Sequence, residues 1–256
     1  MFFETKLARK RRINKDYDAS VLIKKPYEIQ NIRKACAITS QIFDRILKED
    51  LRVGKTEKQI AHKIYDYSQE MLADKELAFE TIVGSGPNSS FVHSEPTDRV
   101  IQAGDVVQFD FGVRINGYCS DLSRVVFMGS KKDAPKKVRA MLKCVKRLQS
   151  EGVARLENHD PFNVIGLWMV ESFKKKDIHY NYLHSLGHGV GQEIHEYPSI
   201  SPKTKPELIP KAGMVVTIEP GLYFSSKFGC RIEDTLLVTE KGAESLTTAS
   251  RELYLA

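Results

Sequence analysis

Hydrophobic positions recur at steps of three and four residues near the start of the chain, and this spacing predicts two amphipathic helices. The first begins at Pro26, a residue suited to the first turn of a helix, and its apolar positions continue to Leu47. The second follows Thr56, which can form a capping box with Gln59, and its apolar positions end at Met71. The N-terminal half is therefore predicted to contain a helix pair.

The same helical spacing returns in the second half of the chain and predicts another helix pair. Apolar residues from Val138 to Leu148 mark the first of these helices. The dipeptide Asp160-Pro161 is expected to cap the second. The apolar positions of that second helix are Val164, Leu167 and Met169.

Apolar runs follow the first helix pair and predict strands over residues 79–83, 106–113 and 118–127. A turn-rich stretch over 84–90 separates the first two. Asn116-Gly117 lies between the last two runs and is the strongest short signal for a β-hairpin. The first half is thus predicted to end in an antiparallel sheet.

Strand-like runs over 214–218 and 232–238 follow the second helix pair, so the order helix, helix, strands occurs twice. This order predicts one α+β domain with an antiparallel sheet and helices on one face. The halves share no detectable sequence identity, so an internal duplication is only suggested by the order of the elements.

The composition is that of a soluble globular protein, with 41% hydrophobic and 28% charged residues among 256. These values exclude intrinsically disordered and collagen-like chains. No run approaches 18 apolar residues, so we expect no membrane span. The N-terminus lacks the apolar core of a signal peptide, which favours a cytoplasmic location.

Much of the net charge of +6 is concentrated between Lys6 and Lys15. We interpret residues 1–24 as a solvated basic leader. No interleaved aromatic residues or nucleic-acid docking motif follow it, so the sequence does not favour a nucleic-acid partner.

The four cysteines show no paired C-x-x-C spacing and lie within apolar segments. They are expected to be reduced, buried thiols of a cytosolic protein. They are Cys36, Cys119, Cys144 and Cys230.

Two aspartates in the predicted hairpin are candidate metal ligands. With Asn116-Gly117 as a two-residue turn, Asp110 lies opposite Ser123 and Asp121 lies opposite Gly112. The two aspartates then share a face as diagonal neighbours, with Cβ atoms about 7–8 Å apart. That separation allows both carboxylates to bind a pair of metal ions, whereas the alternative is a surface hairpin with two solvated acids.

Glu219 and Glu233 form a second acidic pair. If the connection between their strands centres near Ser226, the two glutamates face each other across an antiparallel pair. Buried like charges at such a distance require cations to stay ionised. Either glutamate alone could instead be a surface residue at the end of a strand.

The segment 184–196 holds three of the seven histidines. Gly187, Gly189 and Gly191 surround His188 and permit close approach of a ligand or metal to the backbone. Four carboxylates and one imidazole suit two divalent ions of the manganese, cobalt, iron or zinc kind. Such a pair activates water and polarises a carbonyl group, so the sequence predicts hydrolysis.

Four segments are specific enough to identify a family, namely TIVGSGPN (81–88), DFG (110–112), GYCSD (117–121) and RIED (231–234). With these segments, the chain resembles the pita-bread metallopeptidase family from residue 27 to residue 246. This family includes methionine aminopeptidases, prolidases and Xaa-Pro aminopeptidases. The chain is most similar to the Xaa-Pro branch, because methionine aminopeptidases usually differ around the first aspartate and lack the arginine two positions before the last glutamate. The resemblance implies an α+β pita-bread fold, an antiparallel sheet with two pseudo-symmetric helix-pair halves.

The resemblance also implies a set of metal ligands. Asp110 would bind one metal ion, His188 and Glu219 would bind the other, and Asp121 and Glu233 would bridge both. We expect two divalent ions, manganese first, with cobalt, iron and zinc as alternatives.

Further residues match catalytic and substrate-binding positions of the family. Glu219 would also act as general base. Arg231 would orient a bridging carboxylate, and Tyr223 would form a wall of the substrate site. Three histidines would bind the scissile carbonyl, stabilise the oxyanion or hold the proline side of the substrate, namely His93, His184 and His195.

The expected function is that of a di-metal exopeptidase that hydrolyses the N-terminal bond of peptides and prefers proline after the scissile bond. A methionine aminopeptidase is the alternative enzyme, and a catalytically inactive binding module of the same fold is the alternative from another class. Xaa-Pro peptidases usually carry a separate domain before the catalytic one. Here we expect the leader, residues 1–24, to precede a single catalytic domain, residues 25–256, acting as a monomer or homodimer without a membrane partner.

Overall fold

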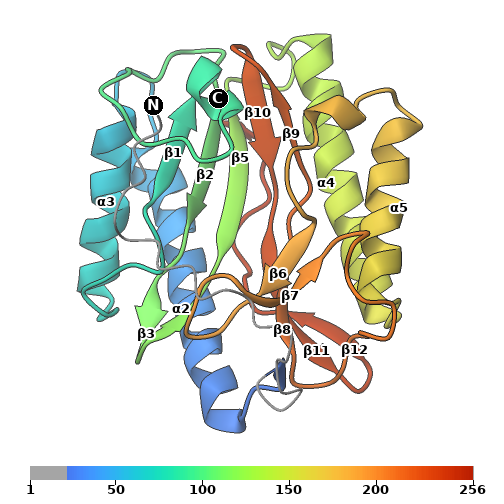
Figure 1. Cartoon of the computed structure of the whole chain (residues 1–256). Helices are drawn as coiled ribbons and strands as arrows, with labels where there is room; N and C mark the ends of the chain where they lie inside the picture. Colours follow the sequence, from blue (N-terminus) through green and yellow to red (C-terminus); the bar gives the residue numbers. More distant parts are fainter. Residues whose placement is uncertain (1–21, 256) are drawn as a thin grey trace, which may run out of the picture.

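Four α-helices of 13 to 22 residues surround a central layer of strands in the computed structural model, which describes residues 22–255 (Figure 1). Residues 1–21 of the predicted leader lie outside the described residues. None of the helices in the described part is long and apolar enough to cross a bilayer. The helices are α2 (Pro26–Arg45), α3 (Glu57–Glu70), α4 (Lys136–Glu157) and α5 (Phe162–Lys174).

The first helix pair forms as predicted. A π-helical turn, η1 (Ile46–Asp50), extends α2 past its last α-helical residue. At the start of α3, the backbone N–H of Gln59 donates to Thr56 Oγ1 at 3.1 Å, and the backbone N–H of Thr56 donates to Gln59 Oε1 at 3.0 Å. The predicted capping box is therefore confirmed.

The strands form two main sheets, and all their pairings are antiparallel except that of β13 with β5. The first sheet has the order β1 (Ile82–Ser85), β2 (Val106–Phe111), β5 (Leu122–Met128), β13 (Tyr254–Leu255). The second has the order β12 (Gly242–Ser245), β11 (Asp234–Thr239), β8 (Val215–Ile218), β6 (Gly187–Gly189), β7 (Glu196–Ile200). Two small hairpins accompany them, β3 (Arg114–Ile115) with β4 (Tyr118–Cys119), and β9 (Gly221–Phe224) with β10 (Phe228–Arg231).

The hairpin around Asn116-Gly117 has the predicted register, with Asp110 opposite Ser123. Both turn residues have positive φ, 51° and 80°, as a type I′ turn requires. The prediction of two unbroken strands was wrong. The ladder breaks at Gly112, where a Cβ atom would lie 1.9 Å from the carbonyl oxygen of Ser120, so the chain bends there.

The first predicted strand is displaced along the chain. It was expected over 79–83, whereas β1 begins at Ile82 and ends at Ser85. In the register of β1 with β2, residues 79 and 80 would face positions beyond the end of β2 at Phe111. Residues 79 and 80 therefore have no strand partner in β2.

The second hairpin turns where the sequence predicted. Ser226 has a φ of 57° and lies between β9 and β10, in which Phe224 pairs with Phe228. The ladder of β8 with β11 continues the same register. Glu219 and Glu233 consequently occupy opposite positions between the two ladders, as expected.

The start and the buried face of α5 differ from the prediction. Asp160 makes no cap, because its carboxylate accepts a hydrogen bond from Arg155 Nη1 at 2.8 Å, and Pro161 is the N-cap residue. Met169 is buried, but Val164 and Leu167 are 42% and 51% exposed. The buried face of α5 consists of Phe162, Ile165, Gly166, Met169 and Phe173, whose helical spacing leaves Val164 and Leu167 on the other side.

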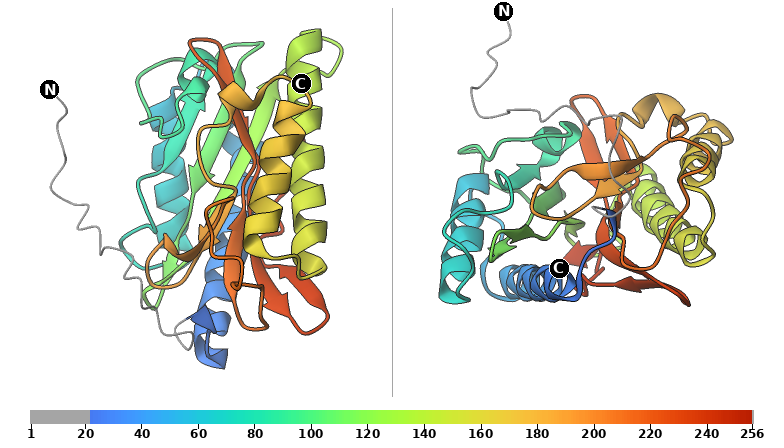
Figure 2. Two further views of the ribbon diagram at one scale, coloured as in Figure 1. Left: turned by 45° about the vertical axis from the view of Figure 1, so that its right-hand side comes forward. Right: turned by 60° about the horizontal axis from the view of Figure 1, so that its bottom comes forward.

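One helix pair lies on each side of the strands (Figures 1 and 2). On α2, Phe43 meets Phe109 of β2 edge to face, with ring centroids 5.4 Å apart. A second apolar cluster joins α4 and α5 to strands of both halves, because it includes Val106 of β2 and Phe127 of β5 beside residues of β8 and β11. The molecule is thus an α+β fold built of two helix-pair halves, and the strands of the two halves meet between them.

The four cysteines are free thiols, and three of them are buried as predicted. Burial raises the pKa of the Cys119 thiol to about 12. Cys144 is only partly buried, contrary to the prediction. It lies beside the buried face of α4, which is formed by residues such as Met141 and Val145.

Candidate metal centre

The five predicted metal ligands lie where the two halves of the molecule meet. Asp110 belongs to β2, and Asp121 immediately precedes β5, so both come from the first half. His188 lies in β6, while Glu219 follows β8 and Glu233 precedes β11, so these three come from the second half. All are buried except Glu219, whose side chain is 13% exposed. The strands of the two halves thus place these polar side chains in the interior of the molecule.

The ligand atoms of three of these residues, Asp121, His188 and Glu233, lie within 4.8 Å of one another. The Nε2 atom of His188 is 3.5 Å from Asp121 Oδ2 and 4.0 Å from Glu233 Oε1. It is also 3.5 Å from Glu219 Oε1. These separations exceed normal hydrogen-bond lengths, so the groups converge without bonding to one another.

Burial shifts the pKa of each of these groups against its charged form. It raises the pKa of Asp121 and of Glu219, and the nearby charge of Glu233 adds to both shifts. It also raises the pKa of Glu233 to about 8, with a further contribution from Asp110. Burial, together with the neighbouring His195, lowers the pKa of His188 to about 3. Without metal, the site thus holds a neutral imidazole among acids whose ionised forms are disfavoured. A bound cation would stabilise the ionised carboxylates and bind the neutral imidazole.

Two carboxylate oxygens in this cluster have no partner. Asp110 Oδ1 and Glu233 Oε1 are buried and accept no hydrogen bond from any described residue. A buried carboxylate oxygen in that situation is costly unless a cation or donor satisfies it. The unpartnered oxygens and the imidazole fit a divalent metal of the manganese, cobalt, iron or zinc kind.

Arg231 neutralises part of the acidic cluster. Its Nη2 donates to Asp110 Oδ2 at 2.5 Å, and its Nη1 donates to the Tyr223 hydroxyl. The sequence predicted that Arg231 orients a bridging carboxylate, but the acid it contacts directly is Asp110, which was expected to bind a single metal. It reaches Glu233 only through Ser123, whose hydroxyl lies 2.8 Å from Arg231 Nε. Sequence analysis missed the contribution of Ser123, although it had placed this residue opposite Asp110.

His184 and Tyr223 lie next to the cluster. His184 Nδ1 is 2.8 Å from the carbonyl oxygen of Ser185, and its Nε2 is 3.1 Å from the Tyr223 hydroxyl. Since a carbonyl oxygen only accepts, Nδ1 carries the proton and Nε2 accepts from Tyr223. Burial, followed by the charge of Arg231, lowers the pKa of His184 to about 3. Tyr182, which sequence analysis did not single out, contacts the other side of this imidazole, with ring centroids 5.5 Å apart.

The other two histidines lie at the exposed side of the site. The ring of His195 meets that of His188 edge to face, with centroids 4.4 Å apart. His93 is exposed and follows the short helix η2 (Gly86–Ser90). It is close enough to add a small contribution to the lowered pKa of His184 and of His195.

The glycines around His188 serve backbone packing rather than ligand access. A Cβ atom at Gly187 would lie 2.0 Å from the carbonyl oxygen of Thr217, and one at Gly189 would lie 2.5 Å from that of Tyr197. These glycines allow β6 to lie against its neighbouring strands, and this close packing positions the imidazole of His188.

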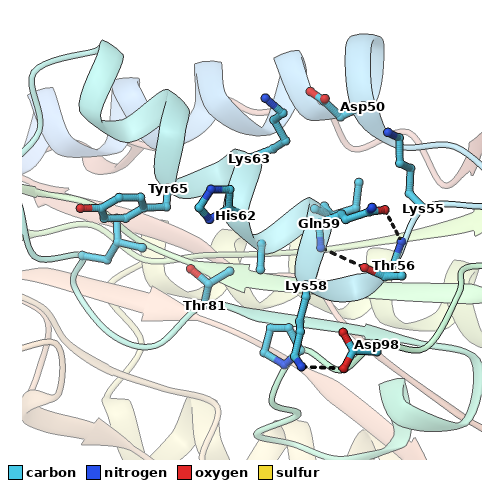
Figure 3. A pocket seen from close by; sticks show the side chains of 14 residues that line it. Asp50, Lys55, Thr56, Lys58, Gln59, His62, Lys63, Tyr65, Thr81 and Asp98 are labelled. Atoms are coloured by element: carbon cyan, nitrogen blue, oxygen red, sulfur yellow. Dashed lines mark hydrogen bonds and ion pairs between the residues drawn. The ribbon is translucent and has the colours of Figure 1, made fainter.

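A separate surface pocket of about 960 Å³ lies against α3. Figure 3 shows its lining, which includes Thr56, His62 and Asp98. None of the predicted site residues lines this pocket.

Comparison with known proteins identifies the family of this chain. Residues 30–240 match metallopeptidase family M24. The chain is 38% identical over 232 residues to an Xaa-Pro dipeptidase of Pyrococcus furiosus, a match that covers 91% of this chain and 65% of that protein. It is 35% identical over 237 residues to an Xaa-Pro dipeptidase of Pyrococcus horikoshii, covering 91% and 64%. The chain therefore spans somewhat less than two thirds of the length of these relatives.

Solved structures show the same similarity. An X-Pro aminopeptidase from Thermotoga maritima superposes with a TM-score of 0.85 at 32% identity, covering 93% of this chain and 65% of that one. The prolidase from Pyrococcus furiosus gives a TM-score of 0.82 at 36% identity, covering 90% and 66%. These likenesses confirm the predicted pita-bread fold. Because the family match spans most of the sequence and the fold agrees, this chain belongs to metallopeptidase family M24.

Proposed function

We propose that this protein is a di-metal exopeptidase that hydrolyses the N-terminal bond of peptides and prefers proline after the scissile bond. The observation that carries the proposal is the convergence of buried acids on His188, with oxygens of Asp110 and Glu233 left unpartnered. The similarity to Xaa-Pro dipeptidases supports the preference for proline. Residues 25–256 would form the catalytic domain, preceded by the leader, residues 1–24.

The acids and the imidazole of the cluster support the metal assignments that the resemblance implied. Asp110 would bind one ion, His188 and Glu219 the other, and Asp121 and Glu233 both. Manganese is the first candidate, with cobalt, iron and zinc as alternatives that suit the same donors. Two such ions would supply Lewis acidity toward the scissile carbonyl and lower the pKa of water.

Glu219 is the residue we assign as general base. Its side chain is 13% exposed, compared with 5% for Asp121 and 2% for Glu233. Asp110 is 12% exposed, but its Oδ2 accepts a hydrogen bond from Arg231, so Glu219 is the acid that attacking water reaches more readily. In the metal-free protein, burial and the charge of Glu233 raise the pKa of Glu219. Its Oε2 lies 3.7 Å from His184 Nδ1, which places the imidazole beside the carboxylate without a hydrogen bond between them.

We divide the substrate contacts among the remaining residues by their hydrogen-bonding state. His184 uses its Nδ1 proton on Ser185 and accepts from Tyr223 at Nε2, so these two side chains would form a wall of the pocket. His195 is exposed beside His188 and would donate to the oxyanion. His93 would contact the proline side of the substrate from the exposed loop after η2. Arg231 would hold Asp110 in place.

A peptide panel tests this proposal. Ala-Pro and Ala-Pro-Ala should be cut at least about tenfold faster than Met-Ala-Ser or Ala-Ala-Ala, equivalent to about 1.4 kcal/mol between transition states. The nitrogen of an Xaa-Pro peptide bond carries no hydrogen. A substrate site that offers no hydrogen-bond acceptor at this position therefore leaves no donor of the Xaa-Pro peptide without a partner. Activity should rise on addition of Mn²⁺ or Co²⁺ and disappear with a chelator.

Two other outcomes would contradict the proposal. Faster cleavage of Met-Ala-Ser would indicate a methionine aminopeptidase. Tight RNA binding without any metal-dependent hydrolysis would indicate an inactive binding module.

Sedimentation of the same preparation would distinguish a monomer from a homodimer.

A further inference from the structure

The hydroxyl of Ser123 lies between the guanidinium group of Arg231 and the carboxylate of Glu233, one of the acids of the metal centre. Ser123 is fully buried in β5, opposite Asp110 in the ladder with β2. Its Oγ is 2.8 Å from Arg231 Nε and 2.8 Å from Glu233 Oε2. Both partners are charged side chains, so this hydroxyl connects the arginine to a carboxylate.

The direction of these two hydrogen bonds is fixed by chemistry. A guanidinium group carries only donors, so Ser123 Oγ accepts from Arg231 Nε. A serine hydroxyl has a single proton, which is therefore donated to Glu233 Oε2. The orientation of this carboxylate thus depends on a donor that Arg231 itself keeps in place.

Arg231 and Ser123 each hold one oxygen of an acid and leave the other free. Asp110 Oδ2 accepts from Arg231, while Asp110 Oδ1 has no partner among the described residues. Glu233 Oε2 accepts from Ser123, while Glu233 Oε1 has none and lies 4.0 Å from His188 Nε2. The held oxygens already accept hydrogen bonds from Arg231 and Ser123, so the free oxygens are those available to a metal ion.

We propose that Ser123 is a positioning residue of the metal centre, whose hydroxyl turns Glu233 so that Oε1 is presented to a divalent cation. This inference rests on the proposed function, because it assumes that the cluster binds metal. A buried hydroxyl with only a packing role would not determine the orientation of a metal-binding carboxylate. Ser40, buried in α2, provides the comparison, since its hydroxyl donates to the carbonyl oxygen of Cys36 and accepts from the backbone of Thr248.

The experiment measures Mn²⁺ binding to metal-free protein by calorimetry. Ser123→Ala and Ser123→Val should bind Mn²⁺ about 10- to 100-fold more weakly than the wild type, as expected for loss of a residue that orients a ligand. Ser123→Thr keeps the hydroxyl and should stay within roughly threefold of the wild type. Ser40→Ala, which also removes a buried hydroxyl with two hydrogen bonds, should leave the affinity unchanged.

The threonine and valine variants give the decisive comparison, because they differ only in a hydroxyl against a methyl group. If Ser123→Ala does not fold, this pair still tests the proposal. Equal Mn²⁺ affinities of Ser123→Thr and Ser123→Val would overturn it, even if both cleave Xaa-Pro peptides. Wild-type protein that binds Mn²⁺ but cleaves no peptide would instead contradict the proposed function and leave the role of Ser123 in place.

Discussion

Two opposing effects act on the pKa of the Glu233 carboxyl group. Its carboxylate is 2% exposed and lies close to the other acids of the cluster, so burial and the charge of Asp110 raise its pKa to about 8. The hydroxyl of Ser123 opposes this shift by donating to Oε2. In the absence of metal the folded protein therefore keeps a proton on Glu233 at pH values where the unfolded chain has lost it.

This difference predicts how the stability of the metal-free protein depends on pH. The pKa of a glutamate in the unfolded chain is about 4.3, so between about pH 4.5 and pH 8 the folded state binds more protons than the unfolded state. The free energy of unfolding should therefore fall as the pH rises through this range. Glu233→Gln removes the titration, so the variant should gain stability relative to the wild type from pH 5 to pH 8.

Urea unfolding in the presence of a chelator, at a series of pH values, measures this effect. If the difference in the free energy of unfolding between wild type and Glu233→Gln stays constant with pH, Glu233 is ionised in the folded state. Added Mn²⁺ should reduce the difference for wild type at high pH, because metal binding requires the deprotonated carboxylate.

The role of a residue can be predicted from the sequence when the contacts that define the role are made by residues close to it along the chain. Asp110, Asp121, Glu219 and Glu233 could be placed from strand register, which a two-residue turn or a short connection fixes locally. The role of Ser123 could not, because it requires the side chain of Arg231 from a strand more than 100 residues away. A serine in an apolar run carries no signal until its partners are known.

At the scale of elements, the loop that carries His93 is fastened to the start of α3 by Glu57. This glutamate is completely buried. Its carboxylate accepts hydrogen bonds from the backbone N–H groups of Ser85 and Thr97 at 2.6 Å and 3.0 Å. It also accepts from three side chains, those of Ser85, Asn88 and Thr97. Its position in the first helical turn adds a favourable interaction with the helix dipole.

Removing this anchor should destabilise the protein. Glu57→Ala would leave two backbone N–H groups and several side-chain donors without a partner, so we expect a loss of roughly 2–4 kcal/mol in the free energy of unfolding. The matched control is Glu95→Ala, an exposed acid in the same loop, which should change stability by less than about 0.5 kcal/mol. Urea unfolding of both variants measures the difference, and equal stabilities would show that the loop is held by other contacts.

Sequence patterns located the elements more reliably than their ends and faces. The capping box of α3 and the turn at Asn116-Gly117 depend on neighbouring residues, and both formed as predicted. The bend at Gly112 depends on Ser120 across the ladder. The anchoring role of Glu57 depends on partners 28 to 40 residues further along the chain, which no local pattern reveals.

At the scale of the whole molecule, the candidate metal centre joins the two halves. The first half contributes Asp110 and Asp121, and the second contributes His188, Glu219 and Glu233. A completely buried ion pair also crosses this boundary, since Arg124 Nη2 lies 2.7 Å from Asp234 Oδ1. Metal ions bound here would therefore link strands of the first half to strands of the second half.

We therefore expect Mn²⁺ to stabilise the entire fold rather than one loop. At a free concentration 100 times the dissociation constant, binding to the folded state alone adds about 2.7 kcal/mol. For a domain of this size, that gain corresponds to a rise in Tm of roughly 5–10 °C. The rise should depend on Mn²⁺ concentration and be reversed by a chelator.

Variants from the two halves test whether the metal links them. Asp121→Asn in the first half and His188→Ala in the second should each lose most of the rise in Tm, because each removes a ligand of the same site. Asp98→Asn, which alters an exposed acid paired with Lys58, should keep the full rise. Scanning calorimetry with and without Mn²⁺ measures all three. A full rise in Asp121→Asn, with loss only in His188→Ala, would place the metal within the second half alone, and the two sheets would then be held together by buried contacts such as the pair of Arg124 with Asp234.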